Sequence, residues 1–285
     1  MSLPPEPASW KVYPAFRDSF PPVRYRGHVA GHETRSGTPL GTRREIPFPR
    51  VFNFRDLGGY ASRDGRAVRW RRLFRSDTLS GLADGDRDRF LGLGIRTVLD
   101  LRRPYEVERD GRVPAWDGLT YRNLNPGHRE WHLTPYHDGL EPVRYLADRY
   151  RDMAEEGAAR FAEAIGMIAD ETAVPLVVHC VAGKDRTGVL CALTLALLDV
   201  ADRDIDADYT RSAVGNRRYL EWLRANRRPD VTPLAWWRAP PGTMRVFLSE
   251  LRQRHGSVER YLTRAGLHTG QVTALRTHLL TPHRS

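Results

Sequence analysis

The chain has 285 residues, of which 40% are hydrophobic and 28% are charged, a composition that supports a sizeable core and excludes a globally disordered chain. Two cysteines exclude a disulfide-rich scaffold, and the apolar runs fall well short of the roughly 20 residues that a membrane-spanning helix needs. The formal net charge is +10, but the arginines alternate with acidic residues instead of forming one basic stripe, so we expect no nucleic-acid partner.

The first part of the chain differs from the rest. Residues 1–45 are rich in Pro, Gly, Arg and Ser and show no hydrophobic period, which predicts an irregular extension. They also lack a basic-then-apolar signal pattern. We therefore expect a cytoplasmic protein, with secretion by a route that needs no signal as the alternative. The sequence gives no indication of the oligomeric state.

From residue 51 onward, short apolar runs are typical of buried strands. Residues 51–54 form the first such run, and Leu73 begins the second. Residues 82–94 predict a brief helix that ends at a glycine. The compact run 95–101 predicts a buried parallel strand.

The middle of the chain predicts a loop followed by a long helix. Residues 104–142 contain many Pro, Gly and His residues and predict a loop. Apolar residues spaced three and four apart then predict a helix over 143–169, with Gly157 inside it. We expect this helix and the loop before it to form a lid.

A second buried strand and its following helix frame the most informative loop. Residues 175–180 predict the strand, 181–187 the loop and 188–200 an almost wholly apolar helix. The later segments 206–223 and 243–251 and the last 25 residues predict further helices. The order of elements predicts an α/β fold with a mostly parallel central sheet flanked by helices.

The loop HCVAGKDRTG contains a cysteine and an arginine six positions apart, Cys180 and Arg186. Backbone N–H groups of the loop and the helix N-terminus favour an anion at this point, and the same charges favour the thiolate of Cys180. Such a thiolate can attack phosphorus. The planar guanidinium of Arg186 can bind two phosphate oxygens at once.

The other loop residues have supporting roles in this hypothesis. Thr187 would donate a hydrogen bond to the sulfur, and His179 would buttress the loop. The phosphate would be bound by the loop itself, which runs through Val181, Ala182, Gly183, Lys184, Asp185 and Arg186. The second cysteine, Cys191, lies within the apolar helix and is interpreted as a core residue. The spacing of a nucleotide-binding P-loop is absent.

The loop resembles the signature of cysteine-dependent tyrosine and dual-specificity phosphatases. The blocks FNFRDLGGY, LFRSDTLSGL, GIRTVLDLR, DADYTRS and YLTRAGL resemble the bacterial tyrosine/serine phosphatase family typified by protein tyrosine phosphatase B. The similarity covers about residues 46–280. Residues 1–45 have no counterpart in it.

This resemblance implies a phosphotyrosine phosphatase-like fold, with a catalytic domain over 46–282 after an extension over 1–45. It implies hydrolysis of phosphotyrosine, with dual or triple specificity as an extension, through a phosphocysteine intermediate and without metal or other cofactor. Cys180 would be the nucleophile and Arg186 the phosphate clamp. Phe54, Arg55 and Asp56 would lie near the rim of the active site.

The general acid has two candidates. No Trp-Pro-Asp motif is present, and Ala115-Trp116-Asp117 is only loosely similar. Asp185 lies in the loop, whereas Asp100 ends the strand 95–101 and matches an acid of the related family. We favour Asp185, although either carboxylate could instead pair with a neighbouring arginine.

Lys184 raises the question of the substrate. A Gly-Lys-x-Arg-Thr loop resembles phosphoinositide phosphatases such as the phosphatase-and-tensin homologue, and an Asp before the Arg resembles myotubularins. Extra positive charge would suit a multiply phosphorylated inositol ring. The expected partners are therefore phosphotyrosine proteins or phosphoinositides, unless Lys184 pairs with a carboxylate outside the pocket.

Three alternatives compete with this interpretation. One is a phosphatase-like module that binds phosphoproteins without turnover, and another is a rhodanese-like sulfur transferase. The intact loop fits each of these less well than it fits an active phosphatase. A metal site at His128, His132 and His137 is the third, but these residues lie on no regular element. We expect no metal.

Overall fold

The computed structural model describes residues 44–131, 136–137, 139–226 and 235–282. The predicted extension over 1–45 lies outside the described residues except for its last two positions. None of the described helices combines the length and the apolar character needed to cross a bilayer.

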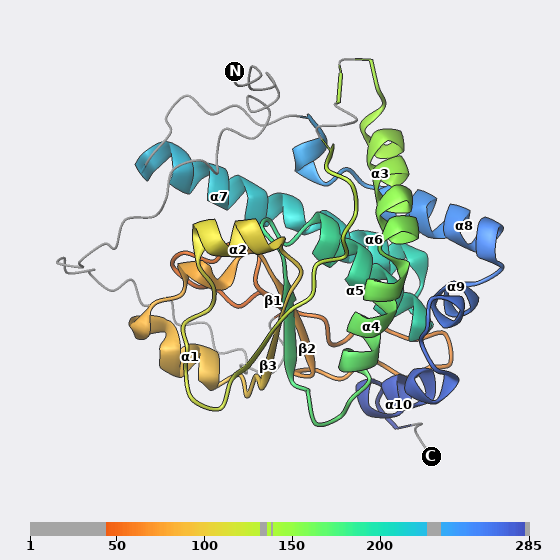
Figure 1. The fold of residues 1–285 in the computed structure, drawn as a ribbon, viewed down its shortest axis with the longest axis horizontal. Helices are drawn as coiled ribbons and strands as arrows, with labels where there is room; N and C mark the ends of the chain where they lie inside the picture. Colours follow the sequence, from red (N-terminus) through yellow and green to blue (C-terminus); the bar gives the residue numbers. More distant parts are fainter. Residues whose placement is uncertain (1–43, 132–135, 138, 227–234, 283–285) are drawn as a thin grey trace, which may run out of the picture.

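A sheet of five short strands forms the centre of the fold (Figure 1). The strands are β1 (Arg55–Asp56), β2 (Leu73–Ser76), β3 (Thr97–Asp100), β4 (Thr120–Asn123) and β5 (Leu176–His179). Their order is β1-β2-β5-β3-β4. β1 is antiparallel to β2, and the other neighbours are parallel. The mostly parallel sheet is therefore confirmed, with β5 at its middle.

The sheet separates two hydrophobic cores because successive side chains point to opposite faces. Phe74, Val98 and Val177 belong to the smaller core, and their neighbours in each strand belong to the larger one. Three parallel strands buried on both faces account for the apolar runs in the sequence. The run 51–54 is not a strand: β1 begins one residue after it, and Phe54 packs into the smaller core.

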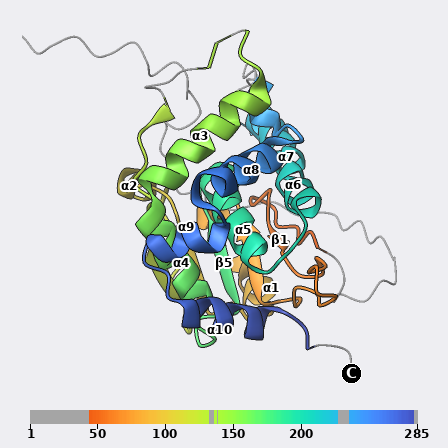
Figure 2. The same cartoon turned by 90° about the vertical axis from the view of Figure 1, so that its right-hand side faces the viewer.

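Helices cover both faces of the sheet. The smaller core lies under α1 (Arg87–Leu91), and α2 (Pro104–Asp110) follows the carboxyl end of β3. Figure 2 shows the thicker helical layer on the other face. This layer comprises α3 (Pro142–Glu156), α4 (Ala158–Ile168), α5 (Asp185–Leu197), α6 (Asp202–Thr210), α8 (Thr243–His255), α9 (Val258–Arg264) and α10 (Thr269–Leu279), while α7 (Ser212–Asn226) extends beyond α6.

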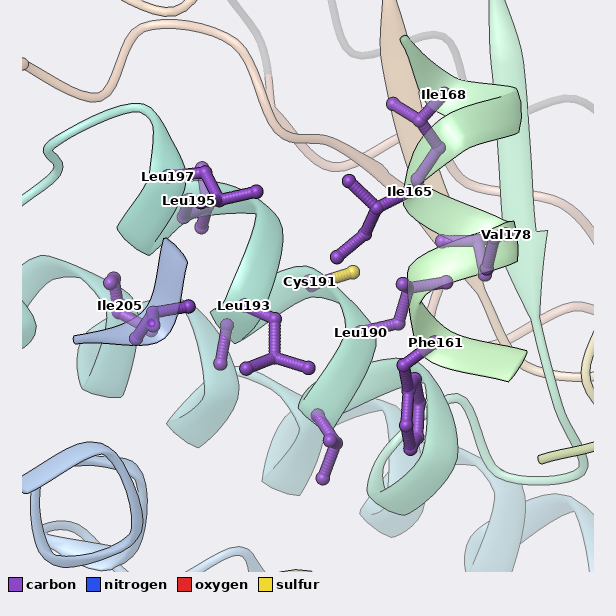
Figure 3. Close-up of a cluster of buried hydrophobic side chains, with 14 of the residues drawn as sticks. Phe161, Ile165, Ile168, Val178, Leu190, Cys191, Leu193, Leu195, Leu197 and Ile205 are labelled. Carbon is purple, nitrogen blue, oxygen red and sulfur yellow. The ribbon is translucent and has the colours of Figure 1, made fainter. Parts of the chain in front are cut away.

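Helix α5 is the centre of the larger core, since other helices surround it. Figure 3 shows Cys191 of α5 among Ile165, Val178 and Leu190. The thiol is buried, and burial raises its pKa to about 11. The prediction that Cys191 is a core residue is confirmed.

The loop prediction for the middle of the chain is wrong. The segment 104–142 was expected to be a loop but contains α2 and β4. Neither element buries a side chain: β4 is an exposed edge strand, and α2 begins with a proline and has no buried residue. Because neither has an apolar face, the hydrophobic pattern shows no periodicity there.

The helix of the expected lid packs into the larger core, and residues 132–135 and 138 of the loop before it lie outside the described residues. The helix predicted over 143–169 is two helices that meet at Gly157, where a Cβ would lie 2.8 Å from the carbonyl oxygen of Pro126. Helix α3 buries Leu146, Tyr150 and Met153 against the helices around it. This buried face is the amphipathic stripe that the sequence pattern predicts.

Candidate active site

Cys180 lies at the carboxyl edge of the sheet, immediately after its central strand. β5 ends at His179 and α5 begins at Asp185, so the residues from Cys180 to Lys184 form the turn between them. Gly183 has a φ of 63°, and a Cβ there would lie 2.2 Å from the carbonyl oxygen of Ser76. Only glycine fits both the conformation and the space.

The outer side of this turn is held by hydrogen-bond donors from neighbouring segments. Asn53 Nδ2 donates to the carbonyl oxygens of Ala182 (2.9 Å) and Gly183 (3.2 Å), and Arg75 Nη2 donates to Gly183 O (2.6 Å). The Thr78 amide donates to the Val181 carbonyl. Because C=O and N–H point in opposite directions across a trans peptide, these contacts leave the following amides to face inward.

A buried carboxylate fixes the arginine beneath the turn. Asp208 of α6 accepts from Arg75 Nη1 (2.5 Å) and from Arg55 Nε (3.0 Å), and all three side chains are at least 98% buried. Burial alone would raise the pKa of Asp208. The charges of Arg55 and Arg75 outweigh burial and hold that pKa below its ordinary value. The turn is thus supported by a charge network shared among β1, β2 and α6.

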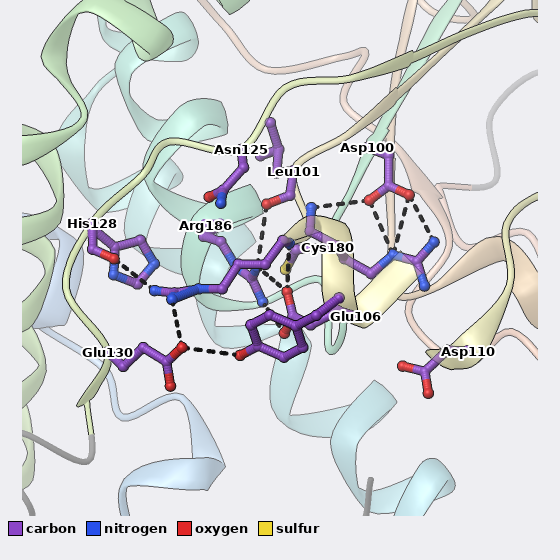
Figure 4. Close-up of polar contacts among 12 residues, drawn as sticks. Asp100, Leu101, Glu106, Asp110, Asn125, His128, Glu130, Cys180 and Arg186 are labelled. Carbon is purple, nitrogen blue, oxygen red and sulfur yellow. Dashed lines mark hydrogen bonds and ion pairs between the residues drawn. The ribbon is translucent and has the colours of Figure 1, made fainter. Parts of the chain in front are cut away.

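Arg186 is held on one edge and open on another. Nη1 donates to Glu106 Oε2 (2.5 Å) and to the Leu101 carbonyl (3.2 Å), and Nη2 donates to Glu106 Oε1 (3.0 Å; Figure 4). A guanidinium has five N–H donors, so one on Nε and one on Nη2 remain. These two share an edge of the plane and form a fork suited to two oxygens of a phosphate.

Glu106 is itself held firmly. Its Oε2 also accepts the Arg103 amide (2.7 Å) in the first turn of α2. Burial would raise the pKa of Glu106, but the adjacent Arg186 lowers it below the ordinary value. The carboxylate is therefore charged at neutral pH and fixes Arg186.

Of the two candidate acids, Asp185 is the accessible one. Its side chain is 22% exposed at the start of α5, and Oδ1 accepts from Tyr150 Oη (2.7 Å) and lies 3.0 Å from Lys184 Nζ. Lys184 is fully buried, and burial lowers its pKa.

Asp100 is instead enclosed. Both of its oxygens accept from Arg102, and Oδ2 also accepts from Tyr121 Oη (2.8 Å). Burial would raise the pKa of Asp100, but His179 and Arg102 outweigh it and lower the pKa to about 2. Its side chain has no exposed surface. Asp100 is thus an ion-pair residue of the core below the site.

His179 lies between Asp100 and the turn. Its Nδ1 is 3.1 Å from the Cys180 carbonyl, and its Nε2 is 3.5 Å from Asp100 Oδ2. Burial lowers the pKa of this imidazole, and the charge of Asp100 opposes that shift. The position is that of a buttress for the turn.

A family model described as the tyrosine phosphatase family matches residues 46–281. The chain belongs to this family. It is a protein-tyrosine phosphatase, and so a phosphoric monoester hydrolase.

Curated relatives agree with this assignment. The triple specificity protein phosphatase PtpB of Mycobacterium tuberculosis is 32% identical over 278 residues, covering 81% of this chain and 98% of the relative. A relative from Cupriavidus necator, whose name places it among tyrosine-protein phosphatases, is 31% identical over 89% of this chain and 94% of its own length. A tyrosine-protein phosphatase of Nostoc commune is 27% identical over 72% of this chain and 73% of its own.

Two solved structures show a more distant likeness. The core catalytic domain of the PP-IP phosphatase SIW14 from S. cerevisiae is 14% identical, with a TM-score of 0.35, and covers 74% of this chain and 94% of its own. TpbA of P. aeruginosa is 13% identical, with a TM-score of 0.31, over 80% of this chain and 99% of its own.

The block FNFRDLGGY supplies three of the expected supporting residues of this phosphatase, Phe54, Arg55 and Asp56. Phe54 packs edge-on against Phe48 at 5.1 Å in the smaller core. Asp56 accepts the backbone amides of Gly58 and Arg71, and so shapes a turn. Arg55 lies beneath the turn, paired with Asp208. All three were expected near the rim of the active site, and all three side chains are buried.

The expected hydrogen bond from Thr187 to the sulfur is not formed in this structure. Thr187 Oγ1 is buried and has no hydrogen-bond partner among the described residues. Its place, two residues into α5, nevertheless leaves it close to the turn.

Five residues of the site were missed from the sequence. They support the turn, Arg186 or Asp185, and they are Asn53, Arg75, Glu106, Tyr150 and Asp208. Asn53, Arg75 and Asp208 lie in blocks already noted for the family resemblance, but no role could be assigned to them from composition. Of the three histidines considered as metal ligands, His132 lies outside the described residues, and no cluster of possible ligands occurs among those described.

Proposed function

We propose that this phosphatase hydrolyses phosphotyrosine through a phosphocysteine on Cys180, without a metal. The observation that supports this most directly is the turn itself. Its carbonyls are tied outward, its nucleophile follows the central strand, and the free edge of Arg186 belongs to the same turn. Such a site offers donors to the equatorial oxygens of a phosphoryl group without reorganising.

In the first step the Cys180 thiolate attacks phosphorus, the S–P bond forms and the P–O bond to the tyrosyl oxygen breaks. Asp185 gives its proton to that oxygen. In the second step water attacks phosphorus, Asp185 takes the water proton, and the S–P bond breaks to release phosphate and the thiolate. Thr187 would donate to the sulfur as it leaves. Asp185 is preferred over Asp100 because Asp100 has no exposed surface.

A wider substrate range is part of the proposal. Phosphoinositides are the second substrate class, since Lys184 adds a cation within the turn and one relative carries the name of a triple specificity phosphatase. We assign the catalytic domain to residues 46–282. A cytoplasmic location agrees with a mechanism that needs a reduced thiol.

Trapping of the phosphoenzyme tests this function. After rapid quenching of a reaction with a ³²P-labelled phosphotyrosine peptide, label should be attached to Cys180 in the parent and in Cys191→Ser, but not in Cys180→Ser. Vanadate should abolish labelling. Binding of the peptide without labelling or turnover would instead identify a binding module, and turnover of thiosulfate with cyanide would identify a sulfur transferase.

A parallel assay tests the substrate range. Parent enzyme is given a phosphotyrosine peptide, a phosphoserine peptide and a phosphoinositide in vesicles, with Cys180→Ser as the blank. Hydrolysis of the peptides without hydrolysis of the phosphoinositide would remove phosphoinositides from the proposal.

A further inference from the structure

A chain of two tyrosine hydroxyls ends on Asp185. Tyr150 Oη of α3 donates to Asp185 Oδ1 at 2.7 Å, and Tyr209 Oη of α6 lies 2.8 Å from Tyr150 Oη. Because the single proton of Tyr150 is given to Asp185, Tyr209 must be the donor in the second bond. The chain therefore has one direction, from α6 through α3 to the start of α5.

Both rings are held rigidly by their surroundings. Tyr150 and Tyr209 are at least 99% buried, and their rings pack edge-on with centroids 5.9 Å apart. Phe247 also packs edge-on against Tyr150, with ring centroids 6.3 Å apart. Burial, reinforced by the charge of Asp185, raises the pKa of each phenol well above 10. Both hydroxyls consequently remain donors at any working pH.

Both side-chain contacts of Asp185 are made to the same carboxylate oxygen. Tyr150 Oη and Lys184 Nζ both meet Oδ1. Within the described part of the chain, Oδ2 has no hydrogen-bond partner. The two donors thereby distinguish two otherwise equivalent oxygens, and they leave Oδ2 for the proton that is exchanged with substrate.

We propose that Tyr150 is a positioning residue that orients the carboxyl group of Asp185 so that Oδ2 exchanges the proton with the leaving oxygen. This inference rests on the proposed function of Asp185 as general acid. Without the Tyr150 hydroxyl, the carboxyl group can rotate and the proton is less often in line with the leaving oxygen. The loss falls on the step that needs protonation, not on phosphate binding.

The test is the dependence of rate on the leaving group in Tyr150→Phe, which removes one oxygen and keeps the ring. The kcat/KM is measured with phenyl phosphate, which needs a proton on its leaving oxygen, and with 2,4-dinitrophenyl phosphate, which does not. We expect a roughly 10-fold loss for phenyl phosphate, part of the full contribution of a general acid, and little loss for the dinitrophenyl ester. The inhibition constant of inorganic phosphate should stay unchanged.

Two variants serve as controls. Tyr261→Phe removes a buried hydroxyl that donates to the Ala154 carbonyl, away from the turn, and should leave both rates unchanged. Tyr209→Phe removes the outer donor only and should give a smaller, still selective, loss. An equal loss on both esters in Tyr150→Phe, or the same selective loss in Tyr261→Phe, would overturn the inference.

Failure of the inference is distinguishable from failure of the proposed function. If the parent forms no phosphocysteine, the function itself is wrong. If the phosphocysteine forms but Asp185→Asn loses both esters equally, Asp185 is not the acid and the role of Tyr150 falls with it. If Asp185→Asn is selective and Tyr150→Phe is not, only the positioning role is wrong.

Discussion

Glu106 binds the guanidinium of Arg186 with both carboxylate oxygens, at 2.5 Å and 3.0 Å. This leaves an Nε donor and an Nη2 donor on the opposite edge for phosphate. Helix α2 contributes no buried side chain, and this contact ties it to the site. The orientation of the phosphate clamp thus depends on a surface helix outside the turn.

Substitution of Glu106 by Gln should therefore reduce catalysis without unfolding the protein. Glutamine keeps the size but loses the charge and one of the two acceptors, so Arg186 is less well oriented. We expect kcat/KM for p-nitrophenyl phosphate to fall by about 10- to 100-fold, less than the roughly 100- to 1000-fold loss when a transition-state donor is removed outright. Glu130→Gln, which removes the charge paired with Arg103, is the matched control. A full rate in Glu106→Gln would contradict the role of α2.

Substitution of Asp208 by Asn should destabilise the fold. The substitution removes the carboxylate that pairs with both Arg55 and Arg75 and leaves these two arginines buried. Removal of one partner from a buried ion pair costs about 3–5 kcal/mol of folding stability. The pKa of Asp208 is lower in the folded state than in the unfolded chain. Its stabilisation is hence present above the unfolded pKa and is lost as the pH falls. Urea unfolding at pH 7 measures the loss. Asp64→Asn, which breaks the more exposed pair with Arg66, should show almost none.

The raised pKa of Asp77 predicts that folding stability depends on pH with the opposite sign. It accepts the backbone amides of Phe52 and Asn53, and burial raises its pKa from 3.8 to about 6. The folded state therefore holds this proton more tightly, and stability should fall as the pH rises from about 4 through 6. Asp77→Asn does not titrate. The free energy of unfolding of the parent relative to this variant should decrease by roughly 2–3 kcal/mol over that range. A constant difference between pH 4 and pH 7 would show that Asp77 does not titrate there.

The two cysteines should differ in reactivity. Cys191 lies in the packed core with a pKa of about 11, so it is a protonated thiol at pH 7. Both cysteine side chains are only 2% exposed, but Cys180 lies in the turn before α5, next to the site, whereas Cys191 lies inside α5. Iodoacetate should therefore alkylate Cys180 in the native protein, inorganic phosphate should slow that reaction, and Cys191 should be modified only after unfolding. Mass spectrometry of tryptic peptides distinguishes the two sites. Modification of Cys191 at the rate of Cys180 would be incompatible with the buried helix.

The parts of the fold that could be predicted are those with a strong hydrophobic pattern. β3, β5 and α5 are buried on all sides, so their apolar runs identify them, and the turn between β5 and α5 follows. α2 and β4 face solvent and lack such a pattern. As a result Glu106, which α2 carries to the site, could not be recognised.

The candidate acids show a different limit. Asp100 and Asp185 look alike in the sequence, since each is followed closely by an arginine. The fold separates them: Arg102 turns back onto Asp100, whereas Arg186 turns away from Asp185 to Glu106. Arg186 and its partner Glu106 are 80 residues apart in the chain. The local spacing of aspartate and arginine therefore cannot predict which carboxylate a guanidinium will bind.

The link from Asp208 through Arg75 to the Gly183 carbonyl also has a consequence during synthesis. A ribosome that has reached residue 200 has already made the nucleophile and the clamp, but it has not made the carboxylate that neutralises the arginine behind them. The emerging polypeptide should remain unable to act on phosphate esters until α6 has left the exit tunnel. Reactivity is in this way withheld from incomplete chains.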